Sequence, residues 1–461
     1  MSRATFPDER AVSWKVLLPQ GPEDKVLALG VDGDGLLGLR RTFPRLDVTP
    51  ANGPYDLVIL GDGCGAAIFD PHDIIGLLRD DGVLVAIGKA ARGDYHNGIA
   101  LSLYKSYASL PIEHPRIFVP LDSRRAALDG LSVHSPGSWR AQAALSLAKA
   151  LRRLGLQWHL RRNVVNFYRR VEADACKGGL LEWLSQSLGY SLTDLVVYAG
   201  SESMRRKITA LALADEGHAN VVVKIADSPH GAEAIRQESE ALAALADTPL
   251  ASHVPRLLLE GQHNGYTIQV QTKASGKRYR QIARLTGDHF QFLYRLTMMS
   301  RQEVKVEDTM AWNDLKVAAE DPSYEGMPDY MLAVLNRILS GQCAQMKIVC
   351  NRIHGDFAPW NIRANRRQFF VFDWEDSQPL GLPFTDVFHF LYRQASLIGP
   401  WHMAGRLLSE MKQAATILSQ LTGIPVEQVE ISLQIWALRE YLAHPSDHIG
   451  EVLRQIAGGS W

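Results

Sequence analysis

The sequence contains few cysteines and no long apolar run. Its four cysteines are Cys64, Cys176, Cys343 and Cys350, and no pair has a metal-ligand spacing such as C-x-x-C. A chain of 461 residues can bury a core without disulfide bonds, so we expect free, buried thiols in a reducing compartment. No stretch approaches the roughly 18 apolar residues of a membrane-spanning helix, and the first residues have no signal-peptide core. These absences predict a cytoplasmic protein.

The net charge is also close to zero, because the sequence contains 49 Lys and Arg residues and 50 Asp and Glu residues. We therefore expect no nucleic-acid binding through bulk electrostatics, and an acidic substrate would need a local cationic cluster. The apolar share of 46% and the charged share of 21% are typical of a soluble globular protein. The length predicts two to four compact units.

The first region, 1–140, alternates short apolar runs with Gly and Asp turns. The runs KVLALG (25–30), YDLVILG (55–61) and GVLVAIG (82–88) each predict a buried strand that ends at a glycine. HDIIGLLRDDG, between the last two, predicts a helix followed by a turn. Strands that alternate with helices indicate an α/β domain with a parallel sheet.

A glycine-rich loop, GVDGDG (30–35), follows the first of these strands. Strand and loop resemble the cofactor-binding start of S-adenosylmethionine-dependent methyltransferases, which implies a Rossmann-like fold and S-adenosylmethionine as cofactor. PRIFVPL and LSVHSP resemble the final antiparallel pair of that fold. However, Ala28 replaces the usual acidic residue, the glycines are spaced one residue too far apart, and few residues separate the first two strands. Asp47 is either the ribose-binding acid or the start of a turn. We interpret the region as a shortened, non-catalytic Rossmann-like domain, with a working methyltransferase as the alternative.

The second region, 141–190, has a helical pattern and predicts a helical connector. It carries paired arginines interleaved with aromatic residues: Arg152, Arg153, Trp158, Arg161, Arg162, Phe167, Tyr168, Arg169 and Arg170. One interpretation is a connector whose arginines are solvated. The alternative is a basic amphipathic surface around 150–170 that contacts an anionic membrane face or glycan.

The third region begins near residue 191. TDLVVYAG, KITALALADEG and ANVVVKIAD predict three successive strands, EAIRQESEALAALA a helix, and VPRLLLEGQ and GYTIQVQTKASG two further strands. After about residue 280 the pattern is mostly helical. A small antiparallel sheet over 191–280 followed by a helical lobe over 281–461 predicts a bilobal α+β arrangement.

Residues 354–361 read HGDFAPWN, and residues 372–375 read FDWE. The intervening IRANRRQFFVF predicts a tight hairpin. Phosphoryl transfer needs a carboxylate against the attacking hydroxyl and metal ions against the nucleotide phosphates. The spacing D-x-x-x-x-N equals that of the protein-kinase catalytic loop, and Asn and Asp oxygens suit Mg²⁺. This pattern predicts a phosphotransferase site.

HGDFAPWNI followed by VFDWE resembles the aminoglycoside phosphotransferase and choline kinase family, which has a protein kinase-like fold. The resemblance implies ATP and Mg²⁺ as cofactors, Asp356 as catalytic base, and Asn361 and Asp373 as metal ligands. It implies further roles around these residues: Glu375 as a metal or neighbouring ligand, His354 as a brace of the loop, and Asp386 as a hydrogen-bond acceptor for the loop.

The small lobe provides candidates for nucleotide binding. Lys224, in VVVKIAD, ends an apolar strand, as does the lysine that grips the α- and β-phosphates in kinases. Glu238, in the following helix, would form an ion pair with Lys224, and Glu240 is the competitor. The loop Gly200, Ser201, Glu202 and Ser203 would cover the phosphates. Gln271 and Thr272 fall where the hinge and the adenine contacts are expected.

The main prediction is therefore transfer of the ATP γ-phosphate to a hydroxyl of a small molecule or glycan. Two alternatives remain, a bifunctional methyltransferase and kinase that acts on a surface polysaccharide, and an inactive scaffold that binds nucleotide. The candidates for the acceptor site are Tyr279, Arg280, Trp312 and Trp360.

Overall fold

The structure, a computed structural model, describes most of the chain. It leaves out residues 1–8, 52, 62, 64–70, 89, 93–100, 112–114, 134–138, 157–159, 161–162, 171–177, 201–202, 215–218, 275, 279–283, 321–326, 366–367, 398–403 and 460–461. The chain divides into two compact units: Met1–Ile235 with Leu257–Lys273, and Arg236–Arg256 with Ala274–Trp461. Among the described residues, no helix combines the length and the apolar character that a membrane crossing requires.

The first unit is built on a 12-stranded sheet with the order β11-β12-β10-β9-β8-β6-β5-β7-β4-β3-β1-β2. Its strands are β1 (Val26–Leu29), β2 (Leu46–Asp47), β3 (Tyr55–Leu60), β4 (Leu78–Ile87), β5 (Leu101–Leu110), β6 (Ile117–Pro120), β7 (Val164–Arg170), β8 (Leu192–Ala199), β9 (Ile208–Ala214), β10 (Val221–Ala226), β11 (Leu257–His263) and β12 (Tyr266–Thr272). The strands predicted near the amino terminus and those of the predicted kinase small lobe therefore belong to one sheet.

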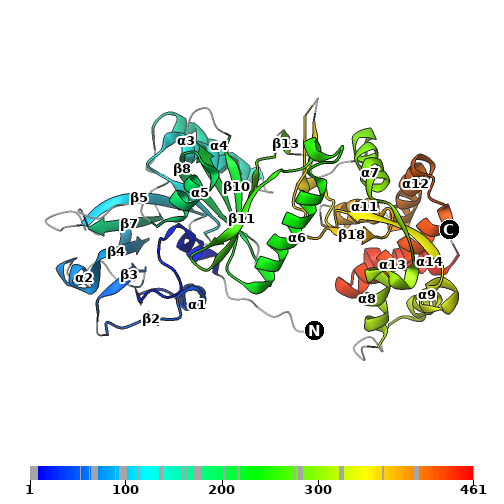
Figure 1. Cartoon of the computed structure of the whole chain (residues 1–461), viewed down its shortest axis with the longest axis horizontal. Coiled ribbons are helices and arrows are strands. Elements are labelled where there is room, and N and C mark those ends of the chain that lie inside the picture. Colours follow the sequence, from blue (N-terminus) through cyan, green and yellow to red (C-terminus); the bar gives the residue numbers. More distant parts are fainter. Residues whose placement is uncertain are drawn as a thin grey trace. The chain divides into compact units, whose positions relative to one another are not determined.

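Helices cover this sheet (Figure 1). They are the 3₁₀ segments η1 (Glu9–Leu17) and η2 (Ala90–Arg92) and the α-helices α1 (Gly33–Thr42), α2 (Pro71–Leu77), α3 (Arg124–Val133), α4 (Trp139–Arg153) and α5 (Leu180–Leu188). Helix α6 (Pro229–Leu245) begins in the first unit and continues into the second.

Strand direction changes along the sheet. β2, β1, β3 and β4 pair in parallel, as predicted for the amino-terminal region. From β4 to β7 onward the pairs are antiparallel, including the pairs of β5 with β6 and of β6 with β8. The result is a mixed sheet, and a separate parallel Rossmann-like sheet is not confirmed.

The strands of the amino-terminal region join those of the predicted small lobe at a seam between β6 and β8. There, Ile117 pairs with Tyr198 and Phe118 with Val197. One apolar core runs across this seam on one face of the sheet and includes Trp14 of η1, Phe118 of β6 and Val223 of β10. Alternate residues form a second core on the other face. Because both faces are buried, these strands read as continuous apolar runs.

A buried lysine links the amino-terminal segment to the end of β10. The side chain of Lys15 is fully buried, and its Nζ lies 2.7 Å from Oδ2 of Asp227 and 2.6 Å from Oγ1 of Thr42. Burial raises the pKa of Asp227, but Lys15 and Arg206 outweigh that effect and lower it overall. The carboxylate is therefore charged, and the ion pair joins η1 to the sheet.

The prediction of helix throughout 141–190 was wrong for Val164–Arg170, which forms β7. β-branched and aromatic residues favour a strand between two neighbours, and Phe167 and Tyr168 are almost completely buried. Arg152 and Arg169 are also buried, and Arg170 forms an ion pair with Asp80. These side chains do not form an exposed basic helix face; Trp158, Arg161 and Arg162 lie outside the described residues. The strand predicted at LSVHSP was also wrong, because Leu131–Val133 ends α3, where the side chain of Leu131 is buried.

The second unit is mostly helical. Its helices are α7 (Gly287–Ser300), α8 (Met310–Ala319), α9 (Asp329–Leu339), α10 (Gly341–Ala344), α11 (Thr385–Leu397), α12 (Ala404–Thr422), α13 (Val426–Ala443) and α14 (Asp447–Ala457), with 3₁₀ segments η4 (Ala251–His253), η5 (Val306–Asp308) and η7 (Pro359–Asn361). Two small sheets complete it: β13 (Lys277–Arg278), β16 (Ile362–Ala364) and β17 (Phe369–Val371); and β14 (Gln302–Lys305), β15 (Lys347–Ile353) and β18 (Gln378–Gly381). Helices α8, α9, α13 and α14 pack together in a bundle (Figure 1).

Cys343 and Cys350 are free and buried, as predicted. Burial raises the pKa of both thiols, that of Cys350 to about 12, so neither is a reactive thiolate. Cys64 and Cys176 lie outside the described residues.

Candidate active site

The segment HGDFAPWN leaves the end of β15 and forms a loop in the second unit. Gly355 has φ 87°, a left-handed conformation that favours glycine. A Cβ on Gly355 would lie 2.2 Å from the carbonyl oxygen of Asp376, which leaves no room for a side chain. The sequence HGD therefore contains glycine because two backbone segments approach closely here.

Helix α11 holds the backbone of this loop through Asp386. Its two carboxylate oxygens accept from the backbone N–H groups of His354, at 2.8 Å, and Gly355, at 3.0 Å. Asp386 is only 3% exposed, and burial raises the pKa of its carboxyl group. This is the loop contact that the family resemblance implies for Asp386. His354 contributes as well, because its ring lies 3.1 Å from the carbonyl oxygen of Phe372 and accepts from the backbone of Asp356.

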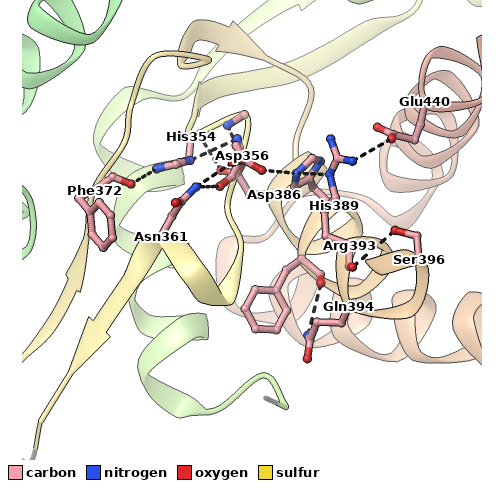
Figure 2. Close-up of polar contacts among 12 residues, drawn as sticks. His354, Asp356, Asn361, Phe372, Asp386, His389, Arg393, Gln394, Ser396 and Glu440 are labelled. Atoms are coloured by element: carbon pink, nitrogen blue, oxygen red, sulfur yellow. Dashed lines mark hydrogen bonds and ion pairs between the residues drawn. The ribbon is translucent and has the colours of Figure 1, made fainter. Parts of the chain in front are cut away.

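Asp356 and Asn361 contact each other directly within the loop (Figure 2). The side-chain nitrogen of Asn361 donates to Oδ2 of Asp356 at 2.8 Å and to its carbonyl oxygen at 2.9 Å. A carboxylate can only accept, so the nitrogen of the amide must face it. The amide oxygen of Asn361 then points to the other side, where it can bind a cation.

A histidine also reaches the predicted base. Nε2 of His389, on α11, lies 2.9 Å from Oδ1 of Asp356. Burial raises the pKa of Asp356, but the hydrogen bond and charge of His389 outweigh burial and lower that pKa overall. Asp356 is therefore ionised at neutral pH, as a residue that takes up a hydroxyl proton must be.

Hairpin register brings the predicted metal ligands together. Ile362 pairs with Val371, and the backbone N–H of Phe372 donates to the carbonyl oxygen of Asn361, so Asn361 and Asp373 lie at the open end of one hairpin. Asp373 has φ 73°, an unusual conformation for a residue with a side chain and one that is common at functional sites. Its charge reaches Asp356 and raises that pKa slightly. Glu375 follows at a partly exposed position.

This donor set is chemically suited to Mg²⁺, which prefers oxygen ligands and binds through a few protein groups, phosphates and water. Among the described residues, no three His, Cys, Asp or Glu side chains form a cluster that could hold a metal alone. Asn361 and Asp373 fit a metal whose remaining ligands come from a nucleotide.

Glu238 and Glu240, the two predicted partners of Lys224, have different environments. Glu238 is fully buried, and its Oε1 lies 3.4 Å from the backbone nitrogen of Trp374, next to Asp373. Glu240 is exposed and pairs with Arg236. The ion pair between Lys224 and Glu238 stays a prediction.

The remaining nucleotide candidates lie in the first unit. Lys224 is 6% exposed on β10, opposite Gln269 of β12. Gly200 follows β8 at a close approach of two backbone segments, since a Cβ there would lie 2.1 Å from the carbonyl oxygen of Lys207. Gln271 is buried at the end of β12, and its Oε1 has no hydrogen-bond partner among the described residues. Thr272 follows it and Ser203 is exposed, whereas Ser201 and Glu202 lie outside the described residues.

The amino-terminal glycine loop has a structural role. Asp32 caps α1 by accepting from the backbone N–H of Gly35 at 2.6 Å. Gly61 lies against Gly30, where a Cβ would approach the carbonyl oxygen of Gly30 to 2.3 Å. Asp47 accepts from the hydroxyl of Tyr55 at 2.9 Å, so its carboxylate already has a partner.

The acceptor candidates are dispersed. Trp312 donates from its indole nitrogen to the carbonyl oxygen of Ile338 at 3.1 Å, which is a packing contact between α8 and α9. Trp360 is partly exposed in the loop, beside Asn361. Tyr279 and Arg280 lie outside the described residues.

The sequence prediction omitted His389 and its neighbour Arg393, whose Nε lies 3.2 Å from Nε2 of His389. A signal was present in FTDVFHFL, where Asp386 and His389 are three residues apart. This spacing places both side chains on one face of a helix.

Residues 210–407 match the family model described as "Phosphotransferase enzyme family". The C-terminal part of the chain therefore contains a phosphotransferase domain with the aminoglycoside phosphotransferase type of kinase fold, and the protein is an enzyme. The match does not extend into the amino-terminal region, so the methyltransferase resemblance there is not shown. No curated protein matches the chain.

Several solved structures are similar to this chain at low identity. A putative fructosamine-3-kinase from Haemophilus somnus 129PT is 13% identical over 61% of this chain and 96% of its own, with a TM-score of 0.38. A mutant of aminoglycoside phosphotransferase APH(4)-Ia, in complex with ADP and hygromycin B, is 16% identical over 60% and 95%, with a TM-score of 0.36. An ethanolamine kinase from Plasmodium vivax is 11% identical over 57% and 82%, with a TM-score of 0.31. Sequence identities and TM-scores this low carry no argument about the function of this chain.

Proposed function

We propose that this protein transfers the γ-phosphate of ATP to a hydroxyl group of a small molecule or glycan. The observation that carries the proposal is the contact between Asp356 and Asn361. It leaves the carboxylate of Asp356 available to the acceptor hydroxyl and the amide oxygen of Asn361 available to a metal ion. The family match over 210–407 supports the same reaction class.

In the proposed reaction, Asp356 accepts a hydrogen bond from the acceptor hydroxyl and orients its oxygen toward the γ-phosphorus. A bond forms between that oxygen and phosphorus while the bond to the bridging oxygen of ADP breaks. The hydroxyl proton passes to Asp356. An ionised, partly exposed carboxylate that two hydrogen bonds hold in one orientation is suited to this role, because it needs no deprotonation beforehand.

Asn361 and Asp373 would bind Mg²⁺, with Glu375 beside them. When bound, the ion would neutralise charge on the nucleotide phosphates. Lys224 would bind the α- and β-phosphates, Glu238 would orient Lys224, and Gly200 with Ser201 and Ser203 would cover the phosphates. The unpartnered Oε1 of Gln271 would accept from the adenine amino group, next to Thr272.

The test is ADP release with magnesium and ATP, measured over a panel of sugars, amino alcohols, aminoglycosides and glycan fragments. Asp356→Ala is the inactivating variant, and Asp376→Ala, in the neighbouring turn, is the matched control. An acceptor-stimulated rate that is lost in Asp356→Ala and kept in the control would support the proposal. A rate that survives Asp356→Ala unchanged, or a wild-type protein that fails to bind magnesium and ATP, would refute it.

A further inference from the structure

Two side chains on one turn of α11 hold the catalytic loop at different points. Asp386 binds the backbone of His354 and Gly355, and His389 binds the side chain of Asp356. Figure 2 shows both residues projecting from the same helix toward the loop. The helix therefore fixes both the loop and the carboxylate that the loop carries.

Both carboxylate oxygens of Asp356 are engaged. Oδ2 accepts from Asn361 at 2.8 Å, and Oδ1 lies 2.9 Å from Nε2 of His389. Two contacts from opposite sides fix the rotation of the carboxylate about its Cβ–Cγ bond. Each oxygen keeps a further lone pair, so an acceptor hydroxyl can still donate to it.

The contact with Asp356 identifies the ring nitrogen of His389 that donates to it. An ionised Asp356 can only accept, so Nε2 of His389 must carry the proton in their contact. Nε of Arg393 lies 3.2 Å from the same ring nitrogen. Arg393 is itself paired with Glu440 at 4.0 Å (Figure 2).

We propose that His389 is a positioning residue for phosphoryl transfer, which holds the Asp356 carboxylate in the orientation that meets the acceptor hydroxyl. This inference rests on the proposed function. Without His389, Asp356 keeps its contact to Asn361 but can rotate about it. The carboxylate of Asp356 is then no longer held in the orientation that catalysis requires, so kcat falls. Nucleotide binding is assigned to other side chains and is unaffected.

The kinetic test compares His389→Leu with His389→Gln. The amide nitrogen of glutamine can occupy the position of Nε2 and donate to Asp356, whereas leucine cannot. We expect His389→Leu to lower kcat by about ten- to hundredfold, with the KM for ATP changed by less than about twofold. We expect His389→Gln to retain kcat within about threefold of the wild type. His444→Gln, at an exposed histidine, is the control and should leave both constants unchanged.

Equal losses of kcat in His389→Gln and His389→Leu, or full activity in His389→Leu, would overturn the inference. A merely structural role predicts a lower thermal midpoint in both variants, together with loss of ATP binding. Thermal unfolding of each variant therefore accompanies the kinetics.

A second measurement does not depend on turnover. ¹⁵N chemical shifts of the histidine rings, with His389 assigned through its absence in His389→Gln, report which nitrogen carries the proton. We expect a protonated Nε2 whose resonance moves in Asp356→Asn. An unprotonated Nε2 would refute the pairing. A wild-type protein that shows the pairing but no turnover with any acceptor would refute the proposed function alone.

Discussion

The side-chain nitrogen of Asn361 lies 2.8 Å from Oδ2 of Asp356, so the predicted metal ligand and the predicted base are in direct contact. Asn361→Asp replaces this donor with an oxygen of nearly the same shape and places two carboxylates against each other. Like charges at this distance cannot both stay ionised without a large energetic cost. We expect kcat to fall by about a hundredfold in steady-state assays of ADP release.

The control for this substitution is Asn365→Asp on the same hairpin. The side chain of Asn365 is exposed, and its Oδ1 accepts from the backbone of Gln368, a contact that Asp can also make. This variant should keep the wild-type kcat. Wild-type activity in Asn361→Asp would show that the contact is unimportant for the reaction.

The loop motif could be predicted from sequence because its parts are local. Gly355, Asp356 and Asn361 lie on one short segment, and a hairpin of fixed register brings Asp373 beside them. By contrast, His389 comes from a helix that is distant in sequence, and one histidine on an apolar helix carries little signal alone.

The continuity of the 12-stranded sheet could not be predicted for a similar reason. The pairing of β6 with β8 joins segments whose individual patterns only say that each is a buried strand. β7 was mistaken for a helix because the pattern of 141–190 was interpreted as helical throughout. In the structure, Arg169 lies over the ring of Tyr104 and Arg170 pairs with Asp80, so both arginines fit within a sheet.

Gly355→Ala should destabilise the second unit strongly. A side chain at φ 87° is strained, and its Cβ would overlap the carbonyl oxygen of Asp376. We expect a loss of about 2–4 kcal/mol in the free energy of unfolding, measured with urea. Gly287→Ala is the matched control, since Gly287 begins α7 with nothing within 4 Å of its Cβ position. An unchanged stability in Gly355→Ala would mean that the two backbone segments are not in close contact.

Lys15→Met tests whether the amino-terminal segment and the small-lobe strands form one folded unit. The substitution leaves the largely buried Asp227 without its nearest cation, although Arg206 remains close. We expect the free energy of unfolding to fall by about 3 kcal/mol in urea titrations. The double variant Lys15→Met with Asp227→Leu should recover most of this loss, because an apolar pair can replace a buried ion pair. Equal free energies of unfolding for the wild type and Lys15→Met would show that the amino-terminal segment and the small-lobe strands do not fold as one unit.

His289 gives the second unit a defined response to acid. Its side chain is fully buried among Phe357, Phe369 and Phe390, and burial lowers its pKa to about 3. Its Nδ1 also accepts from the backbone N–H of Thr286 in a capping box at the start of α7, which requires the neutral ring. The unfolded chain, with a pKa near 6.5, therefore binds a proton that the folded chain does not accept.

This difference in pKa between the folded and unfolded chains sets the direction in which stability changes with pH. The stabilisation is fully present above about pH 6.5, and it is lost as pH falls toward the folded pKa, by up to about 1.4 kcal/mol per pH unit. His289→Gln keeps a residue that completes a capping box and removes the titration. Relative to the wild type, the variant should thus become progressively more stable between about pH 7 and pH 5 in urea unfolding. The exposed His444→Gln should show no such trend, and a constant difference between His289→Gln and the wild type across this range would mean that His289 can be protonated in the folded protein.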